Sequence, residues 1–146
     1  MPPSLSKAFR ILLAIITLTL GGLIYYAYRT ETLAMFKWAE YLGLERWIAC
    51  LRDFASNSRP SEFVVYCLPN ALWTASYLLA VDALVATEDH KLAWGISLPT
   101  IAIILEVCQA FNIISGTFDI LDLLCFLTPT IIFIAYYKFT YHEKNY

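Results

Sequence analysis

Charged side chains are scarce in this sequence. Asp, Glu, Lys and Arg make up 15% of the 146 residues, whereas soluble domains carry about 25%. Apolar residues make up 60%, and a soluble fold of this length has more surface than so few polar residues can cover. The formal net charge is −2, so no strongly basic surface is available for nucleic acid. Composition therefore excludes a soluble enzyme, a disordered chain and a nucleic-acid-binding protein, and it predicts an integral membrane protein.

The sequence also lacks the common motifs of metal binding and catalysis. The four cysteines form no C-x-x-C pair, which removes the usual pattern of zinc and thioredoxin chemistry. The two histidines have no partner at metal-ligand spacing. No P-loop, G-x-S-x-G or H-E-x-x-H pattern is present. We therefore expect no metal and no cofactor, and the sequence indicates no catalytic residue.

Four continuous apolar stretches run along the chain, and each is long enough to cross a bilayer as a helix. They cover residues 11–28, 63–86, 92–114 and 118–139. Strands are not expected, because the apolar residues run on without alternating with polar ones. The sequence predicts an all-α, polytopic membrane protein, a single domain over 1–146 with four transmembrane helices in an antiparallel bundle.

The basic residues of the termini and short connections predict the orientation. Lys7 and Arg10 precede the first stretch, Lys91 lies in the second connection, Lys138 lies at the end of the fourth stretch and Lys144 follows it. The positive-inside rule then places both termini in the cytoplasm and the long first connection outside. The first stretch is longer than the apolar part of a signal peptide and has no small-residue cleavage site after it, so we expect it to remain as a helix.

The long first connection carries an amphipathic pattern within residues 31–56. Its apolar residues recur at helical spacing on one face: Leu44, Trp47, Ile48, Leu51, Phe54 and Ala55. A less regular stretch, 33–42, precedes this face. Trp on the apolar side suits the membrane interface. We expect amphipathic interfacial helices here, which either cap the bundle or form a lid over a site.

Polar residues inside the spans are the strongest indication of a site. Glu106 and Gln109 lie in the third stretch and Asp119 and Asp122 open the fourth, and the i, i+3 spacing puts each pair on one helix face. With a rise of about 1.5 Å per residue, Glu106, Gln109, Asp122 and Asn70 of the second stretch fall near one depth in the outer half of the bilayer, and Asp119 lies at the mouth of its helix. Burying ionisable groups there is costly, so we expect the five residues to form a polar pocket.

Structural roles remain open for part of this layer. Asp119 could cap its own helix, and the two amides could hydrogen-bond neighbouring helices together. Glu106 and Asp122 are harder to explain in this way. The three spans that carry these polar residues have no Lys or Arg at that depth. The two carboxylates require a shared proton, a bound cation, or a basic residue folded in from the 29–62 connection.

The spacing of these polar residues resembles the signature of the VanZ-like membrane proteins. Residues 106–111 read Glu-Val-Cys-Gln-Ala-Phe, and residues 116–122 read Gly-Thr-Phe-Asp-Ile-Leu-Asp. The family has Glu-x-x-Gln-x-Phe at the end of one helix and Phe-Asp-x-x-Asp at the start of the next, with Gly116 and Thr117 here in the turn between them. At the position of Gly116 the family usually carries an arginine. The resemblance implies a small multi-pass protein of the bacterial inner membrane.

Three functions remain open on these grounds. The first is a non-enzymatic accessory or binding protein whose polar pocket holds a lipid headgroup, a cell-envelope precursor or a partner helix. The second is a small subunit of a larger membrane complex. The third is an enzyme acting on a polyprenyl-phosphate or other lipid-linked substrate, and the missing nucleophile and basic phosphate clamp place it last. Membrane lipids are expected partners in each case.

Overall fold

The computed structural model describes residues 6–115 and 118–144, and all regular elements in these ranges are helical. The elements in chain order are α1 (Lys7–Tyr28), α2 (Ala34–Tyr41), α3 (Glu45–Ala55), the π-helical turn η1 (Phe63–Cys67), α4 (Leu68–Leu84), α5 (Glu88–Ala110) and α6 (Ile120–Lys144). Among the described residues, four helical segments are long and apolar enough to cross a membrane: α1, η1 continued by α4, α5, and α6. The all-α, multi-pass character expected from the sequence is therefore confirmed.

Large apolar side chains cover the outside of the long helices. On α1, Leu12, Ile15 and Leu18 are 51–56% exposed. Of the most apolar part of α1, only 11% is buried inside the protein. Water would not tolerate so continuous an apolar surface, whereas hydrocarbon does.

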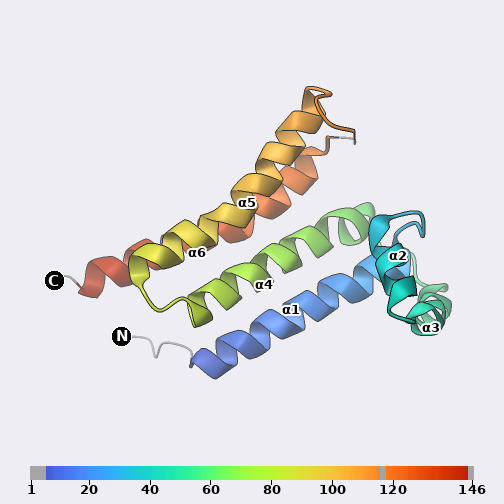
Figure 1. The fold of residues 1–146 in the computed structure, drawn as a ribbon, viewed down its shortest axis with the longest axis horizontal. Helices are drawn as coiled ribbons and strands as arrows, with labels where there is room; N and C mark the ends of the chain where they lie inside the picture. The colour runs from blue at the N-terminus through green and yellow to red at the C-terminus, as the bar shows by residue number, and fades with distance from the viewer. Residues whose placement is uncertain (1–5, 116–117, 145–146) are drawn as a thin grey trace.

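The long helices associate in two pairs (Figure 1). In one pair α1 and α4 lie side by side, and in the other α5 and α6 do; α4 also contacts α6 and so joins the pairs. α1 begins and α6 ends at the same end of the molecule, which we call the terminal end. The opposite end, with α2, α3 and the connection from α5 to α6, is the loop end. Towards the loop end the α5–α6 pair diverges from α1 and α4.

Small residues allow α1 and α4 to approach closely. Ser76 on α4 donates its hydroxyl to the backbone carbonyl of Ala14 on α1 at 2.7 Å. At Gly21 on α1, a Cβ atom would lie 2.6 Å from Nε1 of Trp73, so only glycine leaves room for that indole. Small residues let two helices approach closely and gain van der Waals packing energy. In a membrane this packing drives helix association, because the lipid is as apolar as the helix surface and the hydrophobic effect does not favour helix–helix contact.

A compact apolar cluster joins α4, α5 and α6 nearer the terminal end. Leu78 and Val81 of α4 pack with Phe133 of α6, and all three are buried. Gly95 of α5 is buried against the Phe133 ring, which a Cβ atom at that position would overlap. The ring therefore fills space that a larger residue at 95 would occupy.

The third span ends earlier than the sequence predicts. α5 ends at Ala110 instead of near 114. Asn112 adopts a left-handed conformation with φ 55°, and the backbone N–H groups of Asn112 and Ile113 donate to the carbonyls of Gln109 and Cys108 at 3.0 and 2.9 Å. These are the bonds of a Schellman motif, which terminates a helix by satisfying its last carbonyls. Asparagine tolerates the left-handed conformation, and hydropathy alone does not reveal this stop.

Proline shapes the start of the second span. Pro69 has no N–H to donate, so the helix cannot keep a regular hydrogen-bond ladder there. The turn before it, Phe63–Cys67, is π-helical, and Leu68 N–H donates to the Phe63 carbonyl five residues back. Pro69 itself is fully buried. This irregular turn leads directly into Asn70.

The apolar face expected on α3 is divided between two environments. Ala55 is buried and Ile48 and Leu51 are half-buried on the side that packs against α1. Trp47 and Phe54, on the other edge of the same stripe, are 76% and 87% exposed. The stripe is about 120° wide at 100° per residue, so a single neighbouring helix covers only one edge of it.

Candidate functional site

Asn70 and Asp122 are in direct contact. The Asn70 side chain donates from Nδ2 to Oδ1 of Asp122 at 2.9 Å, which links α4 to α6. The same nitrogen lies 3.4 Å from the carbonyl of Tyr66, which belongs to the π-helical turn η1 before Pro69. Both side chains are half-buried. The structure therefore brings together two of the candidate residues, one from each of these spans.

Glu106 lies beside this pair with one oxygen unsatisfied. Its Oε2 is fully buried and has no hydrogen-bond partner among residues 6–115 and 118–144. The carboxyl group lies near the backbone N–H of Asp119 and within electrostatic reach of the Asp122 and Asp119 carboxylates. A buried acceptor without a donor costs about 1–3 kcal/mol, and neighbouring negative charges add to that cost. Within the described residues, Oε2 therefore lacks the proton, cation or hydrogen-bond donor that would satisfy it.

Asp119 acts as the N-cap of α6. Its Oδ1 accepts from the Leu121 N–H at 2.8 Å, and its backbone carbonyl accepts from Leu123 N–H at 3.3 Å. A carboxylate here also meets the positive end of the helix dipole. The capping role that the sequence left open for Asp119 is thus realised, and this residue explains why α6 begins at Ile120.

The remaining candidates contribute less. Gln109 is half-buried on α5, and in the described part of the chain its side chain makes no hydrogen bond, although its backbone carbonyl closes the Schellman turn. Gly116 and Thr117, expected to form the turn, lie outside the described residues. Residues 6–115 and 118–144 contain no cluster of three or more His, Cys, Asp or Glu suited to a metal ion.

Arg29 is a member of the site that the sequence did not single out. It follows α1 as its C-cap, with its backbone N–H on the Tyr25 carbonyl at 3.0 Å. Its guanidinium carbon lies 4.8 Å from the Tyr66 ring centroid and 5.6 Å from that of Tyr25, within the range of cation–π attraction. It exerts an electrostatic effect on Asp122, but no ion pair within 4.0 Å joins it to a described carboxylate.

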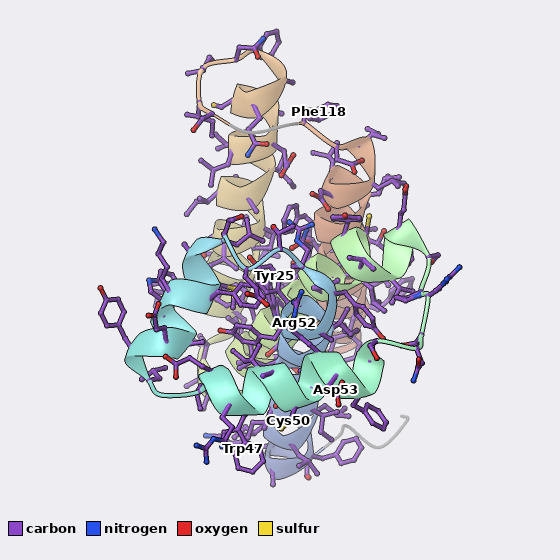
Figure 2. All side chains as sticks on the ribbon, turned by 90° about the vertical axis from the view of Figure 1, so that its right-hand side faces the viewer. Tyr25, Trp47, Cys50, Arg52, Asp53 and Phe118 are labelled. Atoms are coloured by element: carbon purple, nitrogen blue, oxygen red, sulfur yellow. The ribbon has the colours of Figure 1, made fainter. Side chains whose placement is uncertain are left out.

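Arg52 holds the α3 segment over this end of α1. From α3 it donates to the carbonyls of Tyr26 and Arg29 at 3.0 and 2.9 Å and pairs with Glu31 at 3.2 Å. A cation on the last carbonyls of a helix is favourable, because the negative end of the dipole lies there. Figure 2 shows Arg52 pointing from α3 towards the middle of the loop end, where Tyr25 lies, while Trp47 and Cys50 point the other way. With Arg52 engaged in this way, Arg29 is the loop cation positioned towards the carboxylates.

Two buried cysteines form an apolar layer beside the polar residues. Cys67 of η1 is 1% exposed and Cys125 of α6 is 5% exposed. They neighbour each other and lie within electrostatic reach of Asp122. Both are free thiols, and in this setting they pack as small apolar residues.

No protein-family model, curated protein or solved structure matches this chain. The functional conclusions below therefore depend on the geometry of the loop end and on the residues themselves.

Proposed function

We propose that this chain is a membrane-embedded binding protein whose polar layer at the loop end holds the headgroup of a lipid or lipid-linked envelope precursor. The single observation that carries the proposal is the buried Oε2 of Glu106, which has no hydrogen-bond partner among the described residues. Its neighbours Asp119 and Asp122 are also acidic, so the missing partner is a hydrogen-bond donor or a cation. A headgroup amine supplies both.

The position of Arg29 narrows the chemistry of the headgroup. Its guanidinium is held over two tyrosine rings at the same end of the molecule and has no described carboxylate within ion-pair distance. A guanidinium in this state is a good partner for a phosphate group. A headgroup with both a phosphate and a primary amine, such as phosphoethanolamine, matches Arg29 on one side and the Glu106–Asp122 carboxylates on the other.

The proposal places the protein in the bacterial inner membrane as an antiparallel bundle with the loop end outside. The scarcity of Lys and Arg in the short connection after α5 and the presence of Lys7 and Arg10 in the first turn of α1 support this orientation. The exposed Trp47 and Phe54 support an interfacial position for α3. The resemblance of residues 106–122 to the VanZ-like signature implies the same location in the bacterial inner membrane. Membership of that family is itself part of what we propose.

Lipid binding tests the proposal directly. Purified full-length protein would be titrated with short-chain phosphatidylethanolamine and phosphatidylcholine and read by native mass spectrometry. Both headgroups carry one positive and one negative charge, but only ethanolamine has N–H donors. We expect tighter binding of the ethanolamine lipid, and we expect Glu106→Gln to weaken it about tenfold or more, as for a lost hydrogen bond to a charged group.

Asp53→Asn is the matched control, because Asp53 is an exposed carboxylate on α3. It should leave both affinities unchanged. Equal binding of the two lipids by wild-type protein, or unchanged binding by Glu106→Gln, would contradict the proposal. A stoichiometric protein partner retained instead of lipid would favour the alternative, a subunit of a larger complex whose own Lys or Arg satisfies Glu106.

Thiol labelling tests the orientation. Cys50 is exposed on α3, and a variant with the other three cysteines replaced by serine would report on it alone. We expect a membrane-impermeant maleimide to label Cys50 in intact cells or spheroplasts. Labelling only after lysis would mean that the loop end faces the cytoplasm.

A further inference from the structure

Arg52 of α3 binds the backbone at the end of another helix. Its Nη1 donates to the carbonyls of Tyr26 and Arg29 at 3.0 and 2.9 Å, and its Nε lies 3.2 Å from the Glu31 carboxylate. Tyr26 belongs to the last turn of α1, where carbonyls lack partners within the helix. Arg52 therefore holds the chain on either side of the point where α1 ends.

The backbone of Arg29 is held on both sides of its Cα atom. Its N–H donates to the Tyr25 carbonyl at 3.0 Å, and its carbonyl accepts from Arg52. The residue is extended, with φ −81° and ψ 162°, so the helix has already ended and no longer restrains its carbonyl. The two hydrogen bonds together fix the direction in which the Arg29 side chain leaves the backbone.

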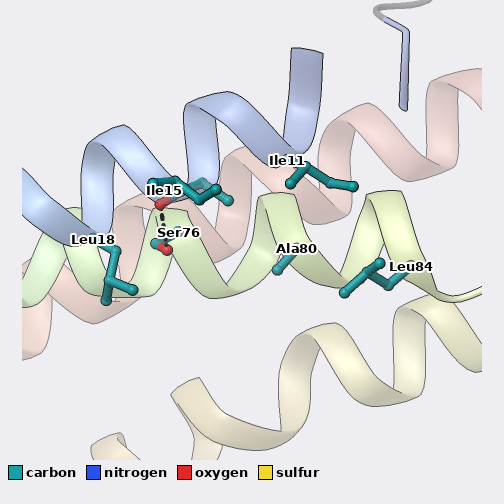
Figure 3. A pocket seen from close by; sticks show the side chains of 7 residues that line it. Ile11, Ile15, Leu18, Ser76, Ala80 and Leu84 are labelled. Atoms are coloured by element: carbon teal, nitrogen blue, oxygen red, sulfur yellow. Dashed lines mark hydrogen bonds between the residues drawn. The ribbon is translucent and has the colours of Figure 1, made fainter. Parts of the chain in front are cut away.

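The Arg29 side chain extends from the end of α1 to the start of the second span. Its guanidinium carbon lies 4.8 Å from the ring centroid of Tyr66 in η1 and 5.6 Å from that of Tyr25. η1 continues into α4, and the Ser76 hydroxyl of α4 donates to the Ala14 carbonyl of α1 at 2.7 Å, a bond that Figure 3 shows between the two helices. Helix packing thus fixes the Tyr66 ring relative to α1, and the place of the guanidinium on that ring depends on the Arg29 backbone.

We propose that Arg52 is a positioning residue for phosphate recognition: by holding the Arg29 carbonyl, it keeps the guanidinium over Tyr66, where a headgroup phosphate binds it. This inference rests on the proposed function, in which Arg29 is the partner of that phosphate. A long side chain that is already ordered loses less conformational entropy when a ligand binds, so the same contact gives a higher affinity. Arg52 acts through Arg29 and not by contact with the headgroup.

The first test is a double-mutant cycle on the full-length protein, titrated with short-chain phosphatidylethanolamine and read by native mass spectrometry. Arg29→Gln removes the phosphate contact and should weaken binding about tenfold or more. The shorter, uncharged side chain of Arg52→Gln releases the Arg29 carbonyl and should weaken binding about two- to tenfold, the cost of ordering one long side chain. In the double variant, Arg52→Gln should add less than about a twofold further loss. Two effects that multiply would overturn the proposal, because Arg52 would then act on the lipid independently of Arg29.

Two further variants separate positioning from a general effect of charge. Arg46→Gln removes an exposed cation from the same helix and should bind the lipid as wild type does. Arg52→Lys keeps a long cationic donor for the Arg29 carbonyl and should bind within about twofold of wild type. A loss in Arg46→Gln as large as that in Arg52→Gln would overturn the proposal, because binding would then follow the charge of α3. A loss in Arg52→Lys as large as that in Arg52→Gln would overturn it as well, since a donor to the carbonyl would then not be the cause.

The second test does not depend on lipid selectivity. In nanodiscs of phosphatidylcholine, the NMR signal of the Arg29 Nε–H group, assigned by its absence in Arg29→Gln, reports on the ring of Tyr66. We expect this signal to be shifted upfield by the ring in wild-type protein and to return to the position of an unordered arginine in Arg52→Gln. An unshifted signal in wild-type protein, or a shift that persists in folded Arg52→Gln, would overturn the proposal. Equal binding of phosphatidylethanolamine and phosphatidylcholine contradicts the proposed function, whereas the Arg29 signal decides the role of Arg52 by itself.

Discussion

The two ends of the molecule treat buried charge in opposite ways. At the terminal end, one carboxylate, Asp82, is met by two cations, Arg10 at 2.6 Å and Lys91 at 3.7 Å. At the loop end, Glu106 is surrounded by further carboxylates and one of its oxygens has no partner in the described chain. The helices are held together at the first end by complementary charge from three elements. At the second end the Asp119 and Asp122 carboxylates lie within electrostatic reach of Glu106, and none of the three forms an ion pair with a described cation.

Packing follows the same division. α1 and α4 meet closely along small residues, and Leu78, Val81 and Phe133 pack near the terminal end. Towards the loop end the α5–α6 pair diverges from the other helices (Figure 1). The loop end nevertheless buries Cys67 of η1, Pro69 of α4 and Cys125 of α6. The two ends therefore differ in helix arrangement and not in whether side chains are buried.

Removing the central carboxylate of the terminal end should have the largest effect. Asp82→Asn leaves Arg10 half-buried without its counter-charge, and removing one member of a largely buried pair is costly. We expect a loss of about 2–4 kcal/mol in the free energy of unfolding, below the full value for a fully buried pair. Reversible unfolding in mixed micelles measures it. The exposed carboxylate variant Asp53→Asn should unfold as wild type, and equal stability of the two variants would remove the distinction between the ends.

The close approach of α1 to α4 predicts the next effect. In Gly21→Ala the new Cβ would lie 2.6 Å from Trp73 Nε1, so the indole or the helix must move, at a cost of about 1–3 kcal/mol. Gly22→Ala is the control, since nothing lies within 4 Å of a Cβ there. That change should be neutral or stabilising by up to about 1 kcal/mol, because alanine favours the helix. Identical unfolding of the two variants would show that the α1–α4 contact is loose.

The hydrogen bond at the loop end should contribute less than either feature. Asn70→Leu leaves Asp122 without the donor that now lies 2.9 Å away. Interhelical hydrogen bonds in membranes contribute about 0.6 kcal/mol on average, so we expect a loss of about 0.5–1.5 kcal/mol. Thr19→Val is a suitable control, because within the described residues the Thr19 hydroxyl bonds only the Ile15 carbonyl of its own helix. A loss as large as that of Asp82→Asn would mean that the loop end is also held together by its polar contacts.

The sequence predicts the spans well and their ends less well. Long apolar runs determine where helices cross a membrane, so the four spans emerge directly from hydropathy. The stop at Ala110 depends on the left-handed Asn112, and the start at Ile120 depends on the Asp119 cap. Each of these two residues lies inside one of the predicted apolar stretches. Hydropathy does not register such backbone events.

The candidate site is predicted in part for a similar physical reason. Depth follows from a constant helical rise, which is why Asn70 and Asp122 could be matched across two helices. Which loop cation turns towards the carboxylates depends on the path of an irregular segment and on two tyrosine rings. The 29–62 connection contains five Lys and Arg residues, and no periodicity distinguishes Arg29 from the others. Its place immediately after the tyrosines of the first span is the one signal available.

Neutralising Glu106 should have the smallest effect on stability of these four changes. Glu106→Gln removes a negative charge from a site that already contains Asp119 and Asp122, and it keeps the size and hydrogen-bonding capacity of the side chain. Because the buried oxygen has no described partner to lose, we expect a change between zero and a gain of about 1 kcal/mol.

Unfolding of Glu106→Gln and Asp82→Asn in the same micelles makes the measurement, since each replaces a carboxylate by its amide. A loss above about 2 kcal/mol for Glu106→Gln would contradict the interpretation and would make the Asp119 backbone N–H its essential structural partner. Opposite signs for the two variants would show that charge is matched for stability at one end and left unmatched at the other. A carboxylate without a partner costs stability, and we expect it to be retained where a bound ligand supplies that partner. Glu106→Gln should therefore raise stability and weaken headgroup binding.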